Sequence, residues 1–212
     1  CIFLSLEFDR IIKPNLFKTK NFFNIHFSYL PSYKGMYTSA LPILNGESNT
    51  GVTLHKIDSG IDTGDIIDQK KIKILQKDTA RDLYLKYIKN GTDLVMKNLT
   101  LLIKNTFNYK VQPKEKSTYF SKKTIDYKNL IINYNQTAFQ ILNQIRAFTF
   151  REYQMPKFND IYISSATITN KKSPFKPGAI IKETKYQITI STIDYNVVLD
   201  KDLFTICCKY SK

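Results

Sequence analysis

The chain has 212 residues, a hydrophobic fraction of 42% and a formal net charge of +14 at pH 7. A chain of this size can bury one substantial core, or one core and a smaller appendage, without metals or disulfides as staples. The sequence contains neither an uninterrupted apolar run of about 18 residues nor a basic-then-apolar leader. This excludes a visible membrane span and secretory signal, and we expect a cytoplasmic protein.

The basic charge would ordinarily indicate a nucleic-acid partner, but only four of the 32 basic side chains are arginines. Lysines dispersed along a chain are more typical of compositional bias than of a nucleic-acid surface, so we expect no nucleic-acid partner, while an anionic phosphorylated substrate stays compatible. The three cysteines, Cys1, Cys207 and Cys208, suit neither a disulfide framework nor spaced zinc ligands. We therefore expect reduced thiols and no metal.

Local patterns in the first half predict strands and helices in alternation. The chain opens in an apolar run at 1–6, which predicts a strand inside a sheet, and we expect that preceding βα units are missing. Apolar residues at helical spacing predict a long helix capped by Asp78 or Thr79 and reaching Lys104, with Gly91 as a weak point. The other elements predicted here are strands at 22–27, 52–57 and 66–74, a loop at 58–65, and a short helix at 36–44 ending at Asn45-Gly46.

The second half begins with a polar segment at 105–118, which predicts a connection leading out of the main domain. An apolar stripe predicts a helix over 137–149. We expect an α/β fold, with part of a mostly parallel sheet and flanking helices over 1–110, followed over 111–212 by a linker, a helix and a smaller β-rich region. The short strands predicted in that last region are 161–168, 179–182, 187–190, 196–199 and 203–207.

The only two histidines, His26 and His55, fall inside one block of polar and glycine residues. Histidine is the side chain most easily poised for proton transfer near neutral pH. Because side chains alternate along a strand, Asn24 and His26 should share one face of the strand at 22–27. The loop that follows the next strand supplies Asp62. We interpret this block as an active site.

Four motifs in this block resemble, in order and spacing, those of the folate-dependent formyltransferases. They are Asn24-Ile25-His26, Leu30-Pro31-Ser32-Tyr33-Lys34-Gly35, Gly51-Val52-Thr53-Leu54-His55 and Asp62-Thr63-Gly64-Asp65-Ile66. Two further segments, 118–127 and 143–156, are similar to the subgroup acting on nucleotide-linked amino sugars, nearest to the dTDP-4-amino-4,6-dideoxyglucose formyltransferases. The resemblance implies a Rossmann-like catalytic sheet whose first half precedes this chain, and a homodimer.

Transfer of a formyl group from N10-formyltetrahydrofolate to an amine passes through a tetrahedral carbon that bears an oxyanion, and the amine must lose a proton. The Asn24 amide can donate to that oxyanion. His26 can relay the proton or, when charged, stabilise the oxyanion, while Asp62 fixes its protonation state and orientation. We expect the carboxylate to raise the pKa of His26. The resemblance implies the same catalytic trio.

The resemblance also implies that the loop at 58–65 contacts the pterin of the folate. Guanidinium groups match phosphate oxygens and aromatic rings can stack, so side chains of these kinds are candidates for binding the sugar nucleotide. An alternative stays open, in which these arginines pair with carboxylates such as Glu152 and the aromatic rings fill a core. The candidate folate-binding residues are Asp58, Gly60, Ile61, Asp62, Gly64 and Asp65, although Asp58 and Asp65 could instead only form turns. The candidate substrate-binding residues are Tyr33, Lys34, Arg146, Phe150, Arg151 and Tyr153. Supporting roles fall to His55, Thr53 and Pro31, the last through a cis bond if it has one.

The leading hypothesis is an N-formyltransferase that acts on the amine of a dTDP-linked 4-amino-4,6-dideoxy sugar for O-antigen or other surface-glycan synthesis. Methionyl-tRNA formyltransferase is an alternative, favoured by the basic charge and the trailing β region. A third hypothesis, favoured by the missing first units, is an inactive formyltransferase-like fragment that acts as a binding module.

Overall fold

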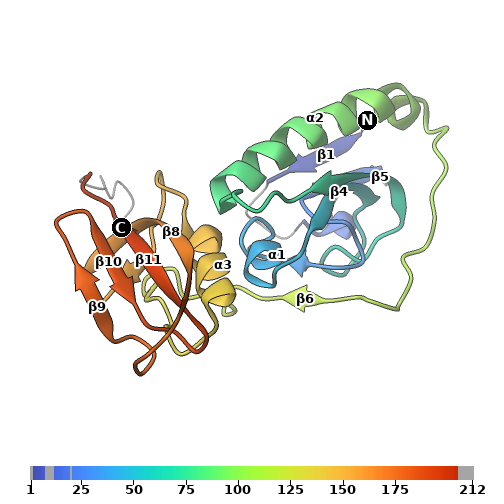
Figure 1. The fold of residues 1–212 in the computed structure, drawn as a ribbon. Helices are drawn as coiled ribbons and strands as arrows, with labels where there is room; N and C mark the ends of the chain where they lie inside the picture. Colours follow the sequence, from blue (N-terminus) through green and yellow to red (C-terminus); the bar gives the residue numbers. More distant parts are fainter. Residues whose placement is uncertain (1, 8–11, 20, 205–212) are drawn as a thin grey trace. The chain divides into compact units, whose positions relative to one another are not determined.

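The structure is a computed structural model that describes residues 2–7, 12–19 and 21–204, so the three cysteines lie outside the described residues. The chain divides into two compact units (Figure 1). The first unit comprises Cys1–Pro42, Ser48–Leu75 and Leu83–Ile125. The second unit comprises Ile43–Glu47, Gln76–Asp82 and Asp126–Lys212.

A four-stranded sheet forms the framework of the first unit, in the order β1-β2-β4-β5. Its strands are β1 (Phe3–Leu6), β2 (Phe22–His26), β4 (Asn49–Lys56) and β5 (Ile66–Lys73). Only β1 and β2 pair in parallel, whereas β2–β4 and β4–β5 are antiparallel, so the expectation of a mostly parallel sheet is wrong for this part of the chain. For β4 and β5 the reason is local, because the short loop at 58–65 returns the chain directly beside β4 and such a loop can join only antiparallel neighbours.

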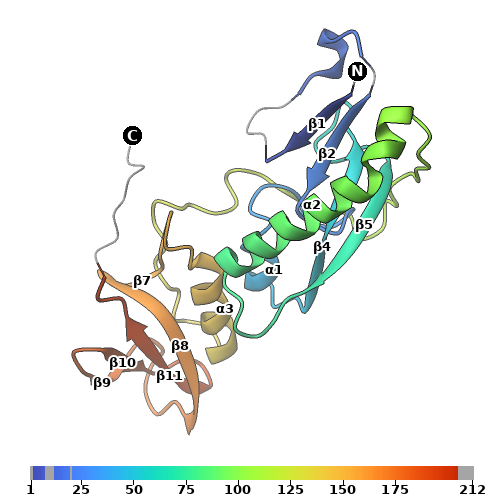
Figure 2. The same cartoon turned by 90° about the horizontal axis from the view of Figure 1, so that it is seen from above.

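Helix α2 (Ala80–Lys104) lies along one face of this sheet (Figure 2). Its start follows the predicted cap, since the Thr79 hydroxyl accepts from the Asp82 amide and the Asp82 carboxylate accepts from the Thr79 amide. Gly91 does not interrupt the helix. A Cβ atom there would lie 3.1 Å from Ile25 and 3.4 Å from Phe27, so glycine lets the helix approach β2 closely.

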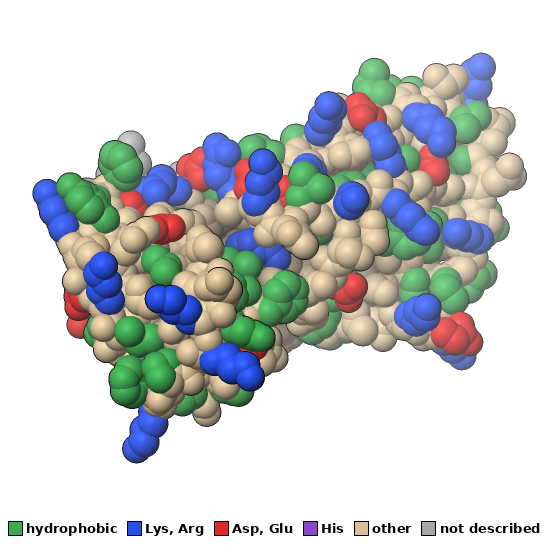
Figure 3. Space-filling model, viewed as in Figure 1, with side chains coloured by type: hydrophobic (Ala, Val, Ile, Leu, Met, Phe, Trp, Pro, Cys, Tyr) green, Lys and Arg blue, Asp and Glu red, His purple; other side chains and the backbone are tan. Residues whose placement is uncertain are grey.

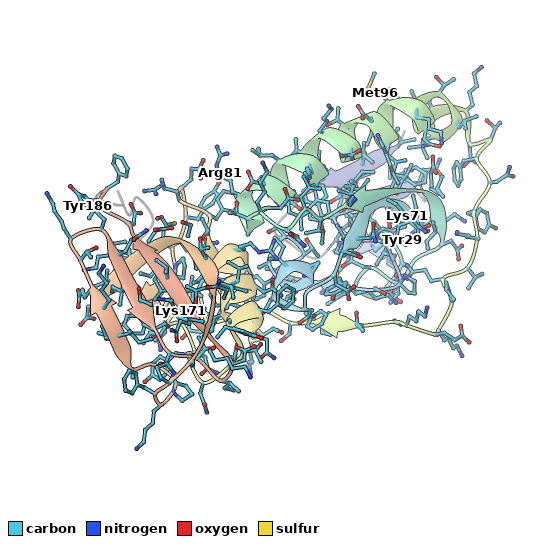
Figure 4. All side chains as sticks on the ribbon, viewed as in Figure 1. Tyr29, Lys71, Arg81, Met96, Lys171 and Tyr186 are labelled. Atoms are coloured by element: carbon cyan, nitrogen blue, oxygen red, sulfur yellow. The ribbon has the colours of Figure 1, made fainter. Side chains whose placement is uncertain are left out.

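Glycine plays a similar part on β4. A Cβ atom at Gly51 would lie 2.7 Å from the ring of Tyr29, which packs over the strand. The Lys71 ammonium of β5 lies 5.5 Å from the centre of the same ring, so the Tyr29 and Lys71 side chains lie side by side (Figure 4). These contacts hold the loop after β2 against the sheet.

The helix predicted over 36–44 is much shorter in the structure. Lys34–Gly35 forms strand β3, which pairs in parallel with β6 (Tyr119–Phe120), and Tyr37 has a left-handed φ of 64° that a helix cannot contain. Only α1 (Leu41–Leu44) is helical, and it is followed by the predicted turn at Gly46, whose φ is 72°. A further 3-10 turn, η1, spans Pro14–Leu16.

The second unit consists of helix α3 (Ala138–Phe148) packed on a five-stranded antiparallel sheet in the order β7-β8-β11-β10-β9. Thr137 and Gln140 form a capping box at the start of the helix. The core between helix and sheet contains Ile141, Ile145, Ile163, Ile188, Val197 and Leu199. The strands are β7 (Lys157–Phe158), β8 (Ile161–Lys172), β9 (Ile180–Glu183), β10 (Gln187–Ile190) and β11 (Tyr195–Lys201).

The strand predicted at 203–207 is not confirmed, since Leu203 and Phe204 are not in a strand and the other three positions lie outside the described residues. Within the described ranges, no helix combines the length and apolar character needed to cross a bilayer.

Candidate active site

Asn24, His26, His55 and Asp62 converge in the first unit, around the end of β2. The Asp62 Oδ2 atom lies 3.4 Å from His26 Nδ1, and its Oδ1 atom lies 3.4 Å from Asn24 Nδ2 and 3.5 Å from His55 Nε2. The Gly35 amide donates to Asp62 Oδ2 at 2.8 Å. The structure therefore brings the predicted trio together and adds His55 to it.

The hydrogen bonds fix which ring nitrogen carries the proton in each neutral histidine. His26 Nε2 lies 2.8 Å from the Tyr33 carbonyl, and His55 Nδ1 lies 2.6 Å from the Lys56 carbonyl. A carbonyl oxygen only accepts, so these nitrogens must donate. The lone pair of His26 is thus on Nδ1 and that of His55 on Nε2, where Asn24 Nδ2 lies 3.3 Å away. A second proton on either ring would sit on the nitrogen that faces Asp62.

Burial of Asp62 opposes its ionisation. The hydrogen bond from His55 and the charge of His26, which these rings supply only when they carry a second proton, outweigh burial together with the Gly35 amide and lower the pKa of Asp62 to about 2. The carboxylate is therefore ionised at neutral pH. Its side chain is only 12% exposed, so these contacts are little screened by water.

The Asp62 carboxylate raises the pKa of His26, as the sequence predicts, but the net shift of that pKa is downward. Burial of the ring lowers the pKa of His26, and the nearby charges of His55 and Lys34 lower it further. Asp62 and the Tyr33 carbonyl raise it, but not enough to compensate. His26 is accordingly neutral at pH 7, with an unprotonated Nδ1 beside Asp62.

The loop that carries Asp62 depends on a glycine. A Cβ atom at Gly64 would lie 1.9 Å from the Lys56 carbonyl oxygen, so this loop can close on β4 only without a side chain there. Asp58 accepts from the Gly60 amide at 3.0 Å, and Asp65 pairs with Lys56 at 3.3 Å. Asp58 and Asp65 thus bind their own loop and β4, while the neighbouring Ile61 is 40% exposed.

The loop after β2 contains the cis Leu30-Pro31 bond that the sequence left open. The Thr53 hydroxyl of β4 donates to the Ser28 carbonyl at 2.7 Å and accepts from the Leu30 amide at 3.1 Å. Gln69 of β5 donates to both Thr53 and the Leu30 carbonyl, at 2.9 Å each. Thr53 therefore holds the loop that leads from His26 to Tyr33.

Among the candidate sugar-nucleotide residues, Tyr33 and Lys34 lie beside the cluster. The Tyr33 ring stacks on Phe120, with ring centres 5.5 Å apart, and Lys34 is only 9% exposed. The other four lie in the second unit, and each makes contacts within that unit. Arg146 donates to the Asp78 carbonyl and Asn143, Arg151 binds the Asp202 carboxylate, and the Phe150 and Tyr153 rings pack edge to face. Glu152 pairs with Arg81 rather than with either of the candidate arginines.

Sequence reasoning missed two residues that contact Asp62. One is Gly35, whose amide contact depends on tertiary folding. The other is Gln112, which donates to the carbonyls of Asp62 and Gly64 at 2.8 and 2.7 Å. Gln112 stands in a polar segment with no periodic pattern, so no local signal could have singled it out.

The surface charge agrees with the dispersed lysines of the sequence. Figure 3 shows lysine and arginine side chains scattered among apolar and other side chains over the face in view. No set of three or more His, Cys, Asp or Glu side chains is arranged to hold a metal ion within the parts of the chain that the structure describes.

Comparison with known proteins gives the family. The formyl transferase family model matches residues 4–99, and that of the formyl transferase C-terminal domain matches residues 124–203. The chain therefore belongs to the formyltransferase family, with a Rossmann-like α/β sheet in its first unit and an antiparallel C-terminal sheet in its second.

Sugar N-formyltransferases are prominent among the similar solved structures. The N-formyltransferase from Helicobacter canadensis, in complex with folinic acid and dTDP-3-aminofucose, is 46% identical with a TM-score of 0.85, over 95% of this chain and 74% of that one. WlaRD, a sugar 3N-formyl transferase solved with dTDP and 5-N-formyl-THF, is 45% identical with a TM-score of 0.85, over 96% and 73%.

Curated sequence relatives include methionyl-tRNA formyltransferases. That of Clostridium tetani is 34% identical over 188 residues, which are 85% of this chain and 58% of the relative. The chain thus spans little more than half the length of such relatives, with 54% for the one from Coxiella burnetii.

Proposed function

We propose that the protein transfers the formyl group of N10-formyltetrahydrofolate to the amine of a dTDP-linked amino-dideoxy sugar. The observation that carries this proposal is the convergence of Asn24, His26 and Asp62 around one point of the first unit. The likeness to solved sugar N-formyltransferases supports the acceptor class.

In this proposal His26 is the base. Its Nε2 proton is held by the Tyr33 carbonyl, so its Nδ1 atom is free to take the proton that the attacking amine loses. The imidazolium then pairs with the ionised Asp62, 3.4 Å away. The low pKa of Asp62 keeps the proton on the histidine rather than on the carboxylate.

Asn24 supplies the hydrogen bond to the oxyanion that develops on the formyl group. Its Nδ2 atom contacts Asp62 and His55 only at 3.4 and 3.3 Å, which are long hydrogen bonds. The amide can therefore exchange one of them for a shorter bond to a charged oxygen. Removing such a donor in acyl transfer slows the reaction by about a hundredfold to a thousandfold.

We propose the loop at 58–65 as the folate-binding loop. The donor is a co-substrate that brings the formyl carbon. The loop suits its flat pterin because the exposed, apolar Ile61 lies beside backbone groups that can meet a hydrogen-bonding edge. Tyr33 and Lys34 are proposed to bind the acceptor in this unit, whereas the internal contacts of Arg146 and Arg151 weaken their proposed role.

For the acceptor, the sequence predicted a 4-amino sugar. We rank a 3-amino sugar above it, because one solved relative is in complex with dTDP-3-aminofucose and the other is named a sugar 3N-formyl transferase. The predicted homodimer and the role in O-antigen or surface-glycan synthesis stay predictions.

The test is incubation of the purified chain with N10-formyltetrahydrofolate and matched dTDP-linked 3-amino and 4-amino sugars, followed by mass spectrometry. A product heavier by one CO supports the proposal, and the faster isomer identifies the acceptor. Asn24→Ala should abolish most of the rate, whereas Asn98→Ala, which removes a buried amide from α2, should affect stability alone. Failure with all amino sugars, together with retained folate binding, would favour the binding-module alternative.

Methionyl-tRNA is the second candidate acceptor, favoured by the curated relatives and the charge of +14. The dependence of affinity on salt concentration distinguishes the two acceptors. The affinity for tRNA should fall steeply as salt rises because counterions are released from the phosphates, whereas a sugar nucleotide offers too few charges for a steep slope. Formylation of methionyl-tRNA, without any product from the amino sugars, would replace our proposal.

A further inference from the structure

The segment 110–122, which leads from α2 toward the second unit, crosses the first unit beside both loops of the site (Figure 1). We call it the brace. The sequence predicted most of it as a plain connection. In the structure its two ends are bonded to different strands: Lys110 exchanges two backbone hydrogen bonds with Ile66, the first residue of β5, and β6 pairs with β3.

The brace holds Tyr33 in an unfavourable backbone conformation. Tyr33 has a φ of 60°, a region that non-glycine residues rarely adopt. Its amide donates to the Thr118 hydroxyl at 2.7 Å, and the backbone of Thr118 bonds the Pro31 carbonyl and the Lys34 amide on either side. In this conformation the Tyr33 carbonyl meets His26 Nε2. Thr118 thus fixes the group that decides the tautomer of His26.

The brace holds Asp62 in the same way. Asp62 has a φ of 54°. The side-chain amide of Gln112 donates to the Asp62 backbone carbonyl at 2.8 Å and to the Gly64 backbone carbonyl at 2.7 Å. The Gln112 Oε1 atom is buried without a hydrogen-bond partner among the described residues, which costs free energy. The two hydrogen bonds that Gln112 donates fix the backbone that carries the Asp62 carboxylate.

We propose that Gln112 and Thr118 are positioning residues, which hold Asp62 and Tyr33 in left-handed conformations so that both meet the His26 ring. Strained backbone of this kind persists only where the surroundings enforce it, and it gathers at functional sites. The inference rests on the proposed function for its effect on turnover, but its effect on His26 can be measured without turnover.

The experiment uses NMR of the histidine rings, because the chain has only His26 and His55 and both belong to the site. Nitrogen shifts of the rings give the tautomer, and a pH titration gives the pKa of His26. In the unaltered protein we expect a proton on Nε2 of His26 and on Nδ1 of His55. The other groups that act on His26, namely Asp62, His55 and Lys34, are the same in every variant below.

Thr118→Val removes the hydroxyl but keeps the shape and the backbone bonds. His26 should lose its single tautomer, and its pKa should fall, since the Tyr33 carbonyl stabilises the charged ring. Thr118→Ser retains the hydroxyl and should restore both properties. Gln112→Met should lower the pKa of His26 as well, because the Asp62 carboxylate raises it. In the two Thr118 variants His55, bonded to Lys56, is the internal reference, whereas in Gln112→Met both rings face the displaced Asp62 carboxylate.

Gln144→Met is the matched control, since it removes a side-chain amide that bonds the backbone of Asn133 and Ile131 in the second unit. It should lower the melting temperature without changing either histidine. With the acceptor sugar, Gln112→Met and Thr118→Val should lower kcat by up to about a hundredfold, as misplacement of a reacting group does, with KM little changed.

Unchanged His26 tautomer and pKa in folded Thr118→Val and Gln112→Met would overturn the inference, whatever happens to stability. If the unaltered protein transfers no formyl group to any acceptor, the proposed function fails, while the NMR result still decides whether the brace positions the site.

Discussion

Asp62→Asn is the substitution that tests the electrostatics of the site most directly. Asparagine has nearly the same shape and can still accept from the Gly35 amide, but it carries no charge toward His26 and His55. The loss of stability caused by this substitution therefore measures the charge interactions that hold the pKa of Asp62 at about 2 instead of its ordinary 3.8.

A pKa difference of this size corresponds to about 2 kcal/mol between the charged and neutral forms. Because the pKa of the folded state is the lower one, this stabilisation is complete above pH 3.8 and is lost as the pH falls toward 2. At about pH 4.5, just above the range in which Asp62 titrates, the variant should be less stable by about 2 kcal/mol, and at pH 3 the difference should shrink to about 1 kcal/mol.

The assay is urea unfolding of both proteins at about pH 4.5 and at pH 3, followed by circular dichroism. The m-value should be unchanged, since the same surface is exposed on unfolding. A variant as stable as the unaltered protein at about pH 4.5, or a difference in free energy of unfolding that is the same at pH 3, would refute the reasoning. The carboxylate would then not be held by the contacts described.

Three further predictions concern single side chains. If His26 is the base, kcat/KM should rise with pH through a pKa below 6.5, because burial lowers the pKa of this ring. A midpoint above 6.5 in the pH profile of kcat/KM would contradict this prediction. Gly64→Ala should lower the free energy of unfolding in urea by about 1–3 kcal/mol, since the added Cβ meets the backbone of β4. The Cβ added by Gly60→Ala meets the movable Thr63 side chain, so this variant should lose less stability, and equal losses in the two variants would refute the distinction. Tyr87→Phe should lower the free energy of unfolding by about 1–3 kcal/mol in thermal unfolding, because the buried Thr50 hydroxyl and the part-buried Thr38 carbonyl lose the phenol hydroxyl. An unchanged melting temperature would count against it.

Elements with strong local signals were predicted well. Helix α3 begins and ends within one residue of its predicted bounds, because the cap at Thr137 and the apolar stripe are both local features. Strand β2 places Asn24 and His26 on one face for the same reason, since alternation along a strand follows from the backbone alone.

Predictions failed where a distant part of the chain intervened. The expected helix at 36–44 begins late because Lys34–Gly35 pairs with Tyr119–Phe120, more than eighty residues away, and the Met36 amide also donates to the Phe120 carbonyl. Gly91 was judged a weak point of α2, but packing against Ile25 and Phe27 makes glycine suitable there. In both places tertiary contacts override the local preference.

The sequence by itself determined the family, the long helices and the set of polar side chains from which the site is built, because motif spacing, capping residues and periodicity are properties of neighbouring positions. Only the tertiary structure decided what those side chains are like chemically. The burial that keeps His26 neutral, the contacts that keep Asp62 ionised, and the brace that reaches both through Gln112 and Thr118 all join residues far apart in the chain. Burial and long-range contact arise only when the chain is folded, so local sequence patterns carry no record of them.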